Sequence, residues 1–193
     1  MIYGVVANLS RHDRYRTPNT FLLGVIPNME KEPSSLNSFL DVLVDELIEG
    51  YEGWPIIVQG DTVPTLFKVA LVQICSDLPA ARKACGFLSH SATFGCSRCK
   101  KKFVGEFGHH DYSGSDSSHD MRTNSETRQH MLEVRRTTRN VTARRLIESS
   151  LGVRYSVFIR LPYYLPVTFC VIDVMHNLYQ GTSKLLLKLW EEK

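Results

Sequence analysis

The sequence has no long apolar run and no export signal. No stretch of its 193 residues approaches the roughly 20 consecutive apolar residues needed to span a bilayer. The apolar run within residues 1–10 has neither a basic lead-in nor a small-residue cleavage pattern, so we interpret it as a strand and not as a signal peptide. These absences predict a nuclear or cytoplasmic protein without a membrane partner.

The number of cysteines is odd. Five cysteines without an export signal indicate a reducing compartment, where thiols pack or bind metal and seldom form disulfides. Cys96 and Cys99 form a C-x2-C pair, and thiolates at this spacing supply two of the four ligands of a tetrahedral zinc ion. The nearby histidines, His90, His109 and His110, lack the spacing of a second ligand pair, so two ordinary thiols are the alternative.

Carboxylates are absent between Arg82 and Lys102. Residues 1–76 carry 5 basic and 9 acidic side chains, whereas residues 82–145 carry 13 basic and 6 acidic ones. This segregation suits contact with a polyanion, of which nucleic acid is the commonest, while a solvated basic face is the alternative. The residues predicted to contact DNA are Arg82, Lys83, Arg98, Lys100, Lys101, Lys102, Arg135, Arg136 and Arg139.

The pattern of apolar residues predicts a mixed α/β fold. Runs rich in β-branched and aromatic residues predict strands, and apolar residues at helical spacing predict helices. The run 66–75 is nearly all apolar, which is typical of a strand buried on both faces of a sheet. The expected β segments are 2–9, 20–26, 54–58, 66–75 and 152–164, and the expected helices are 36–50, 80–86, 125–150 and 171–193, with Gly50 ending the first and Gly181 interrupting the last.

Asp77 follows the apolar run 66–75. A carboxylate at the end of a buried strand can hold a divalent cation at a sheet edge. Two-metal phosphoryl transfer needs about three such carboxylates, so Asp77 alone does not make a site. The alternative is a strand-end residue or a helix cap before Pro79.

Asp173 and His176 form a second candidate group. Positions three residues apart share one face of a helix, so Asp173 can orient His176, or both can approach a common ligand. A hydrogen bond that only supports the start of a helix is the alternative.

Several segments resemble, in order, the motifs of CACTA-type (En/Spm) transposases. Residues 75–99 resemble that family's D-x-P-A…G-F…H…G-C-x-x-C block. Residues 152–156 (GVRYS), 161–164 (LPYY) and 172–178 (IDVMHNL), followed by Gly181-Thr182, resemble its later motifs. The resemblance covers almost the whole chain.

The resemblance implies a DDE-type transposase, which acts on the DNA of transposon ends. It implies a partial RNase H-like α/β core with a mixed sheet, lacking its first strand, in residues 1–104, a flexible loop in 105–124, and a helical insertion in 125–193. It assigns Asp77 to the second carboxylate for Mg²⁺ or Mn²⁺, and Cys96 and Cys99 to half of a Zn²⁺ site. Self-association or association with a full-length transposase are the protein partners it suggests.

The chain departs from the family in the carboxylates that it carries. The first catalytic Asp of the family lies before the point where this chain begins, and the third carboxylate and the zinc-binding His pair lie beyond Lys193. Asp13 and Asp61 are expected in loops and do not match the first Asp. We therefore expect a chain that does not cleave DNA alone. The alternatives are a domesticated DNA- or protein-binding module that uses residues 82–145, and an independent zinc-binding domain.

Overall fold

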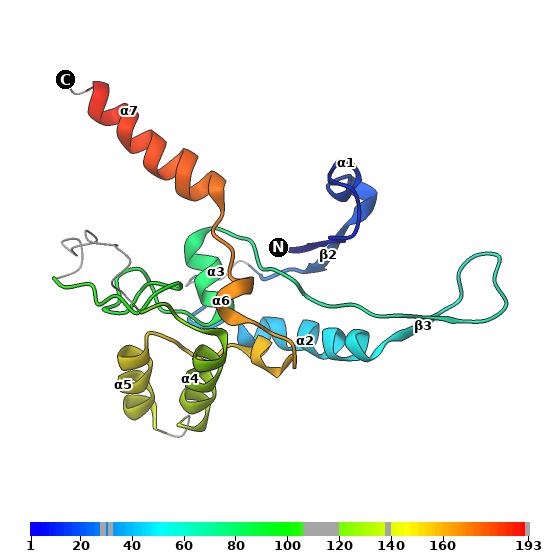
Figure 1. Cartoon of the computed structure of the whole chain (residues 1–193), viewed down its shortest axis with the longest axis horizontal. Helices are drawn as coiled ribbons and strands as arrows, with labels where there is room; N and C mark the ends of the chain where they lie inside the picture. Colours follow the sequence, from blue (N-terminus) through cyan, green and yellow to red (C-terminus); the bar gives the residue numbers. More distant parts are fainter. Residues whose placement is uncertain (28–29, 31–32, 106–119, 138–139, 192–193) are drawn as a thin grey trace. The chain divides into compact units, whose positions relative to one another are not determined.

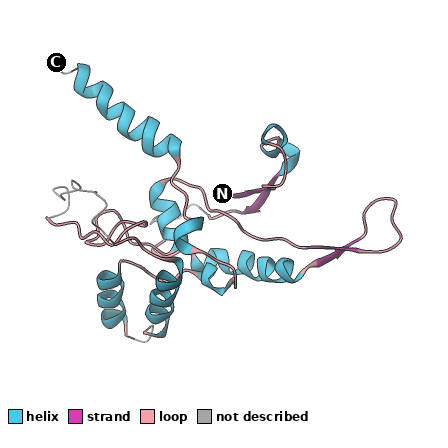
Figure 2. Ribbon diagram, viewed as in Figure 1, coloured by secondary structure: helices cyan, strands magenta, loops and turns pink. Residues whose placement is uncertain are grey.

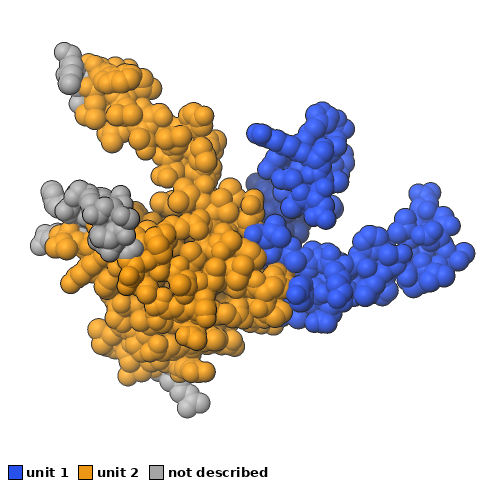
Figure 3. Space-filling model, in the orientation of Figure 1, with its two compact units in different colours: residues 1–72 blue, residues 73–193 orange. Residues whose placement is uncertain are grey.

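Two units, residues 1–72 and 73–193, make up the chain in the computed structural model (Figure 3). About 47% of the chain is helical, and the described strands form two small antiparallel sheets, both in the first unit (Figure 2). The expected mixed α/β class is confirmed. The expected single mixed sheet is not confirmed, because each sheet has two antiparallel strands. The structure describes all residues except 28–29, 31–32, 106–119, 138–139 and 192–193 (Figure 1).

The first unit begins with a hairpin of β1 (Ile2–Val5) and β2 (Thr20–Gly24). The strands pair antiparallel, with Val5 opposite Thr20 and Tyr3 opposite Leu22. The two expected strands are therefore confirmed, although both are shorter than the apolar runs that predict them. The connection between them contains two short helices, α1 (Arg11–Arg14) and η1 (Thr17–Asn19).

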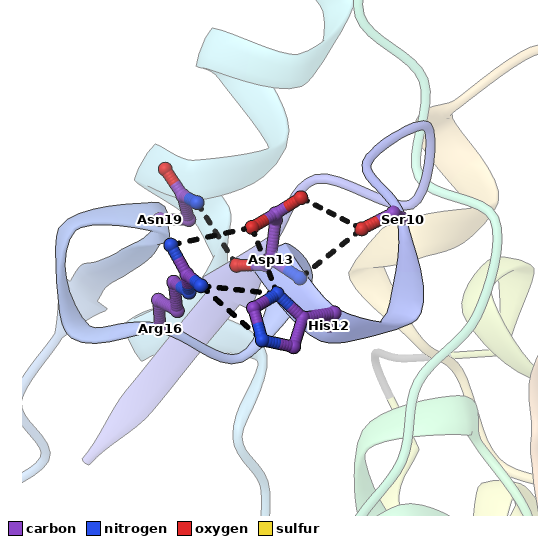
Figure 4. A network of polar contacts seen from close by, with 5 residues as sticks. All are labelled: Ser10, His12, Asp13, Arg16 and Asn19. Atoms are coloured by element: carbon purple, nitrogen blue, oxygen red, sulfur yellow. Dashed lines mark hydrogen bonds and ion pairs between the residues drawn. The ribbon is translucent and has the colours of Figure 1, made fainter.

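A network of polar side chains holds this connection together (Figure 4). The Ser10 hydroxyl accepts a hydrogen bond from the Asp13 backbone N–H at 3.2 Å and donates one to Asp13 Oδ2 at 2.7 Å, so Ser10 caps α1. The Asn19 amide donates to the Asp13 carbonyl at 2.9 Å, and the Arg16 guanidinium lies 3.5 Å from Asp13 Oδ1. Asp13 thus lies in a capped helix, and its expected place in a loop is wrong.

The helix α2 (Asn37–Glu52) confirms the expected amphipathic helix, because Leu40 and Val44 are buried and most of its exposed residues are polar, Val42 being an exception. Gly50 does not end it. The helix continues to Gly53, whose φ of 124° suits glycine. A Cβ atom at Gly50 would lie 3.0 Å from the Trp54 ring, so this glycine allows the ring to approach the helix.

The second sheet pairs β3 (Trp54–Ile56) with β4 (Thr65–Phe67). The expected strand over 66–75 is wrong beyond residue 67, and the side chains of Leu66 and Phe67 are 59% and 41% exposed. A strand buried on both faces needs other elements packed over each face, whereas β4 belongs to a two-stranded sheet and its residues are exposed. The rest of the run forms no strand and is irregular apart from an isolated bridge at Ile74.

The second unit is helical. Its elements are α3 (Leu78–Cys85), α4 (Asn124–Arg136), α5 (Val141–Leu151), η2 (Val157–Arg160), α6 (Pro166–Phe169), the π-type helix η3 (Met175–Ser183) and α7 (Lys184–Glu191). The core packs α3 and α4 against the chain that follows α5; its buried residues are Ala81, Cys85, Phe87, Met131, Val134, Val153, Ile159 and Cys170. Within the part of the chain that the structure describes, no helix is both long enough and apolar enough to cross a membrane.

Four expectations about this unit can be compared with the structure. The helix at 80–86 is confirmed as α3, which ends at Gly86 with a left-handed φ of 85°. The single helix over 125–150 is wrong, because Asn140 caps a separate helix α5. The β segment at 152–164 is also wrong: after an isolated bridge at Val153, the chain turns into η2. Gly181 lies inside η3 and does not interrupt it.

Candidate functional site

The Cys96–Cys99 segment forms a tight turn closed on a sulfur atom. The backbone N–H groups of Arg98 and Cys99 both donate to Cys96 Sγ, each at 3.3 Å. Beyond the turn, Cys99 forms an antiparallel bridge with Met121, and Lys100 N–H donates to the Asp120 carbonyl at 2.9 Å. Both cysteines are partly buried free thiols. The structure therefore places the C-x2-C pair on a tight turn.

The surroundings of the turn favour a thiolate at Cys96. Burial raises the pKa of the Cys96 thiol, but the N–H groups of Arg98 and Cys99 and the Arg82 guanidinium lower it by more, so the pKa lies below the ordinary value. At Cys99, burial and the neighbouring Cys96 thiol raise the pKa. A thiolate is the form that binds metal, so Cys96 is the better prepared ligand of the two.

The Arg122 side chain donates hydrogen bonds to the backbone around the Cys96–Cys99 turn. This side chain is only 6% exposed and donates to the carbonyls of Cys96 at 2.9 Å, Leu151 at 3.0 Å and Phe94 at 3.3 Å. The guanidinium carbon also lies 6.0 Å from the centre of the Phe87 ring. One buried cation therefore fixes the backbone on both sides of Gly95 and ties it to the end of α5.

The described residues do not form a complete metal site. They contain no group of three or more His, Cys, Asp or Glu side chains placed to hold a metal ion. Two thiolates fit two corners of a tetrahedral zinc site, and a closed site needs two further ligands. His90 is not grouped with the cysteines, and His109 and His110 lie outside the described residues.

Asp77 is the N-cap of α3. Its Oδ1 accepts a hydrogen bond from the Ala80 N–H at 2.8 Å, and Pro79 stands in the first turn. The expectation that Asp77 ends a buried strand is wrong, because residues 72–77 form no strand. The alternative of a cap before Pro79 is what the structure shows. Its carboxylate is exposed, and Oδ2 bonds to none of the residues that the structure describes.

A parallel bridge relates Asp77 to Asp173. Ile74 N–H donates to the Phe169 carbonyl at 2.7 Å, and Val171 N–H donates to the Ile74 carbonyl at 3.1 Å, so Ile74 pairs with Cys170 in parallel. Asp77 and Asp173 each lie three residues beyond this bridge, on the same side of it. Burial, followed by the nearby Asp173 carboxylate, raises the pKa of the Cys75 thiol.

Asp173 and His176 are joined by a hydrogen bond. His176 Nδ1 contacts Asp173 Oδ2, and the Met175 N–H donates to Asp173 Oδ1 at 2.9 Å. The bond to His176, followed by the bond from Met175, lowers the pKa of Asp173. The pair stands at the start of η3, with His176 exposed. The structure therefore confirms that the two side chains share a face.

The basic residues predicted to contact DNA occupy different environments. Arg98 donates to the carbonyls of Val167 at 2.5 Å and Cys170 at 2.9 Å, and Lys100 forms an ion pair with Glu126 at 2.7 Å. Contact with DNA stays a prediction for all of them. Arg82 and Lys83 are partly buried on α3, Lys101 is partly buried, Lys102 and Arg136 are exposed, Arg135 stacks on Tyr155, and Arg139 lies outside the described residues.

Sequence reasoning missed two arginines and one thiol pair. Arg122 and Arg128 count only as charge in the sequence, yet both bind several backbone carbonyls, Arg128 that of Ile159 at 2.7 Å. Cys85 and Cys170 lie together in the core, and their contact, with burial, raises the pKa of Cys85. No local spacing signals these roles, because each joins segments distant in the sequence.

Comparison of the chain with models of protein families, with curated proteins and with solved structures found no match.

Proposed function

We propose that this chain belongs to a transposon-derived protein of the DDE type and acts on DNA. The proposal includes an RNase H-like core, which the resemblance implies. The observation that carries it is the arrangement of one short segment. Asp77 opens α3 and the Cys96–Cys99 turn follows the same helix, so the two groups that the resemblance assigns to metals belong to one folded unit.

Capping and metal binding at Asp77 are compatible. The cap uses Oδ1, which accepts the Ala80 N–H, while exposed Oδ2 faces no competing donor among the described residues. Carboxylate oxygen is the ligand that Mg²⁺ and Mn²⁺ prefer. Bound with further carboxylates, such ions activate the attacking oxygen and stabilise the leaving oxygen of a phosphodiester. This chain contributes one carboxylate ligand to such a site, that of Asp77, which its cap holds at the start of α3.

Binding of Mn²⁺ to the full chain, followed by electron paramagnetic resonance, tests the assignment of Asp77. Asp77→Asn keeps an Oδ1 acceptor and hence the cap of α3, but removes the negative charge. We expect this variant to bind less Mn²⁺ than the wild type. Asp61→Asn, at an exposed acid outside the motifs, is the matched control and should bind as the wild type does. Equal binding by wild type and Asp77→Asn would show that Asp77 is a cap only.

Zinc content tests the role of the cysteine turn. Purified chain should carry zinc that Cys96→Ser or Cys99→Ser lowers, because each substitution removes one thiolate from the site. Cys75→Ser, at an exposed thiol outside the turn, should leave the zinc content unchanged. Zinc that is absent from the wild type, or equally present in all variants, contradicts the zinc half-site.

The genomic DNA on either side of the reading frame tests the transposon origin. We expect it to encode a strand with an Asp upstream, and a His pair with a Glu downstream. Flanking DNA that encodes neither, and that contains no terminal repeats, contradicts the proposal.

A further inference from the structure

The α4–α5 hairpin carries a group of exposed arginines at one end. Arg135 and Arg136 form the last turn of α4, and Arg145 lies in the first half of α5. The two helices are consecutive in the chain and pack against each other (Figure 1). The end of α4 and the beginning of α5 therefore lie at the same end of the hairpin, which we call the arginine end.

Most other charges of the hairpin are already satisfied within the unit. Arg128 points inward to the carbonyls of Ile159 and Leu161. Glu126 pairs with Lys100 at 2.7 Å, and Arg144 pairs with Glu148 at 3.7 Å. Among the described residues of the hairpin, the exposed charged side chains are Glu133, Arg135, Arg136 and Arg145, which gives the exposed face a net positive charge.

Arg135 is held in place by an aromatic ring. Its guanidinium carbon lies 4.9 Å from the centre of the Tyr155 ring, and Tyr155 is partly buried against the core. Stacking uses the flat face of the guanidinium and leaves its N–H edges available. A side chain ordered in advance loses less conformational entropy when it contacts a phosphate.

Helix stability accounts for only part of this arrangement. Cations in the last turn of a helix interact favourably with the helix dipole, which suits Arg135 and Arg136. Arg145 is the fifth residue of α5, beyond the first turn, so the helix dipole neither favours nor disfavours a cation there. Arg145 is exposed and forms no ion pair with the described residues. An anionic ligand would interact favourably with all three exposed side chains.

We propose that the arginine end, through Arg135, Arg136 and Arg145, binds the phosphate backbone of DNA. This inference rests on the proposed function, because it takes DNA as the polyanion. Exposed arginines offer N–H donors to phosphate oxygens, and such contacts position a protein on DNA without identifying bases. The contact is independent of base sequence.

The salt dependence of DNA binding tests this surface. The full chain is titrated against a fluorescent duplex of arbitrary sequence over a range of salt concentrations. The slope of log K against log salt is negative, and each lost phosphate contact reduces its magnitude by about 0.9. At about 0.1 M salt this corresponds to a roughly 8-fold loss of affinity. We therefore expect a triple variant to show a slope smaller in magnitude by about 3 and an affinity lower by roughly 500-fold. This variant carries Arg135→Gln, Arg136→Gln and Arg145→Gln.

A matched triple variant controls for net charge. Arg11→Gln, Lys68→Gln and Lys184→Gln remove the same charge from exposed positions elsewhere and should change the slope by less than one contact. Circular dichroism should show that both variants keep the helical content of the wild type.

The outcomes separate this inference from the proposed function. Wild type that binds DNA, with both triple variants equally weakened or equally unaffected, overturns the arginine end while DNA remains the substrate. Wild type that is not retained on DNA at low salt overturns both. Binding of polyglutamate with the same affinity and the same dependence on the three arginines identifies an acidic protein as the partner and overturns the assignment to DNA.

Discussion

Replacing Arg122 with methionine tests how the Cys96–Cys99 turn is held. Methionine fills much of the volume of the arginine stem but donates no hydrogen bond. The substitution leaves three carbonyls, those of Phe94, Cys96 and Leu151, without their donor in a site where the side chain is only 6% exposed. Burial lowers the pKa of Arg122, so the charge itself is held at a cost that the three bonds offset.

The magnitude follows from these opposing effects. Hydrogen bonds to a charged group contribute about 1.5–3 kcal/mol each, and desolvation of the guanidinium subtracts several kcal/mol from their sum. Removing one side of such a buried arrangement typically costs about 3–5 kcal/mol, so we expect the second unit to lose about 4 kcal/mol. Arg122→Lys keeps the charge but lacks the several N–H donors of the guanidinium. Its free energy of unfolding should therefore lie between those of the wild type and Arg122→Met.

Native-state hydrogen exchange at the amides of α4 and α5 measures this loss within the second unit. Arg136→Met, at an exposed arginine of α4, is the control and should change the opening free energy by less than about 0.5 kcal/mol. A loss below about 1 kcal/mol for Arg122→Met would show that the carbonyls find other donors, and the argument for Arg122 would fail.

Gly152→Ala should destabilise the second unit by about 2–4 kcal/mol, measured in the same exchange experiment, because φ is +70° and a Cβ atom would lie 2.4 Å from Arg122 Nη2. Glu126 has its pKa lowered by the hydrogen bond from Lys100, so it stabilises the fold above the pKa of an unfolded glutamate and loses this effect as pH falls through its folded pKa. Glu126→Gln should therefore flatten the acid side of the stability profile and leave it unchanged at the lowest pH. Mass spectrometry after alkylation of the metal-free chain near neutral pH should show Cys96 modified several-fold faster than Cys99; equal rates would contradict the thiolate at Cys96.

The helices that sequence reasoning found are those whose signals are local. Asp77, Pro79 and Gly86 bracket α3 within ten residues, and each acts on the backbone beside it. The apolar spacing of α2 depends on nothing outside the helix. Its end was misplaced because Gly50 serves the approach of Trp54, a contact that the helical pattern alone does not encode.

The expected strands failed where pairing depends on distant partners. Residues 66–75 and 152–164 are both apolar and β-branched, yet the structure gives them short or isolated bridges. In the second segment, the Ser156 hydroxyl donates to the Ala84 carbonyl at 2.6 Å and caps η2, so a local turn replaces the strand. Propensity for β structure describes a side chain that fits a sheet, and it does not supply the neighbouring strand.

The candidate site likewise contains residues that a local sequence pattern identifies and residues that no local pattern identifies. The spacing of Cys96 and Cys99 predicts a turn because two residues between them fix the geometry. Arg122 could not be found in this way, since its three carbonyl partners lie between 26 and 29 residues away. Counting charges places Arg122 in a basic region. It does not distinguish a buried arginine that binds backbone carbonyls from an exposed arginine that could contact DNA.

Asp77 shows that a structural role and a functional role need not compete for one side chain. The cap engages Oδ1 and fixes the rotamer of the carboxylate, while Oδ2 stays open to solvent. Fixing the rotamer in the folded chain removes an entropic cost that a free aspartate would incur on binding a cation. A capped Asp is for that reason a better prepared ligand than an uncapped one. Asp77→Asn separates the two roles, because it keeps the acceptor for Ala80 and removes only the charge that a divalent cation requires.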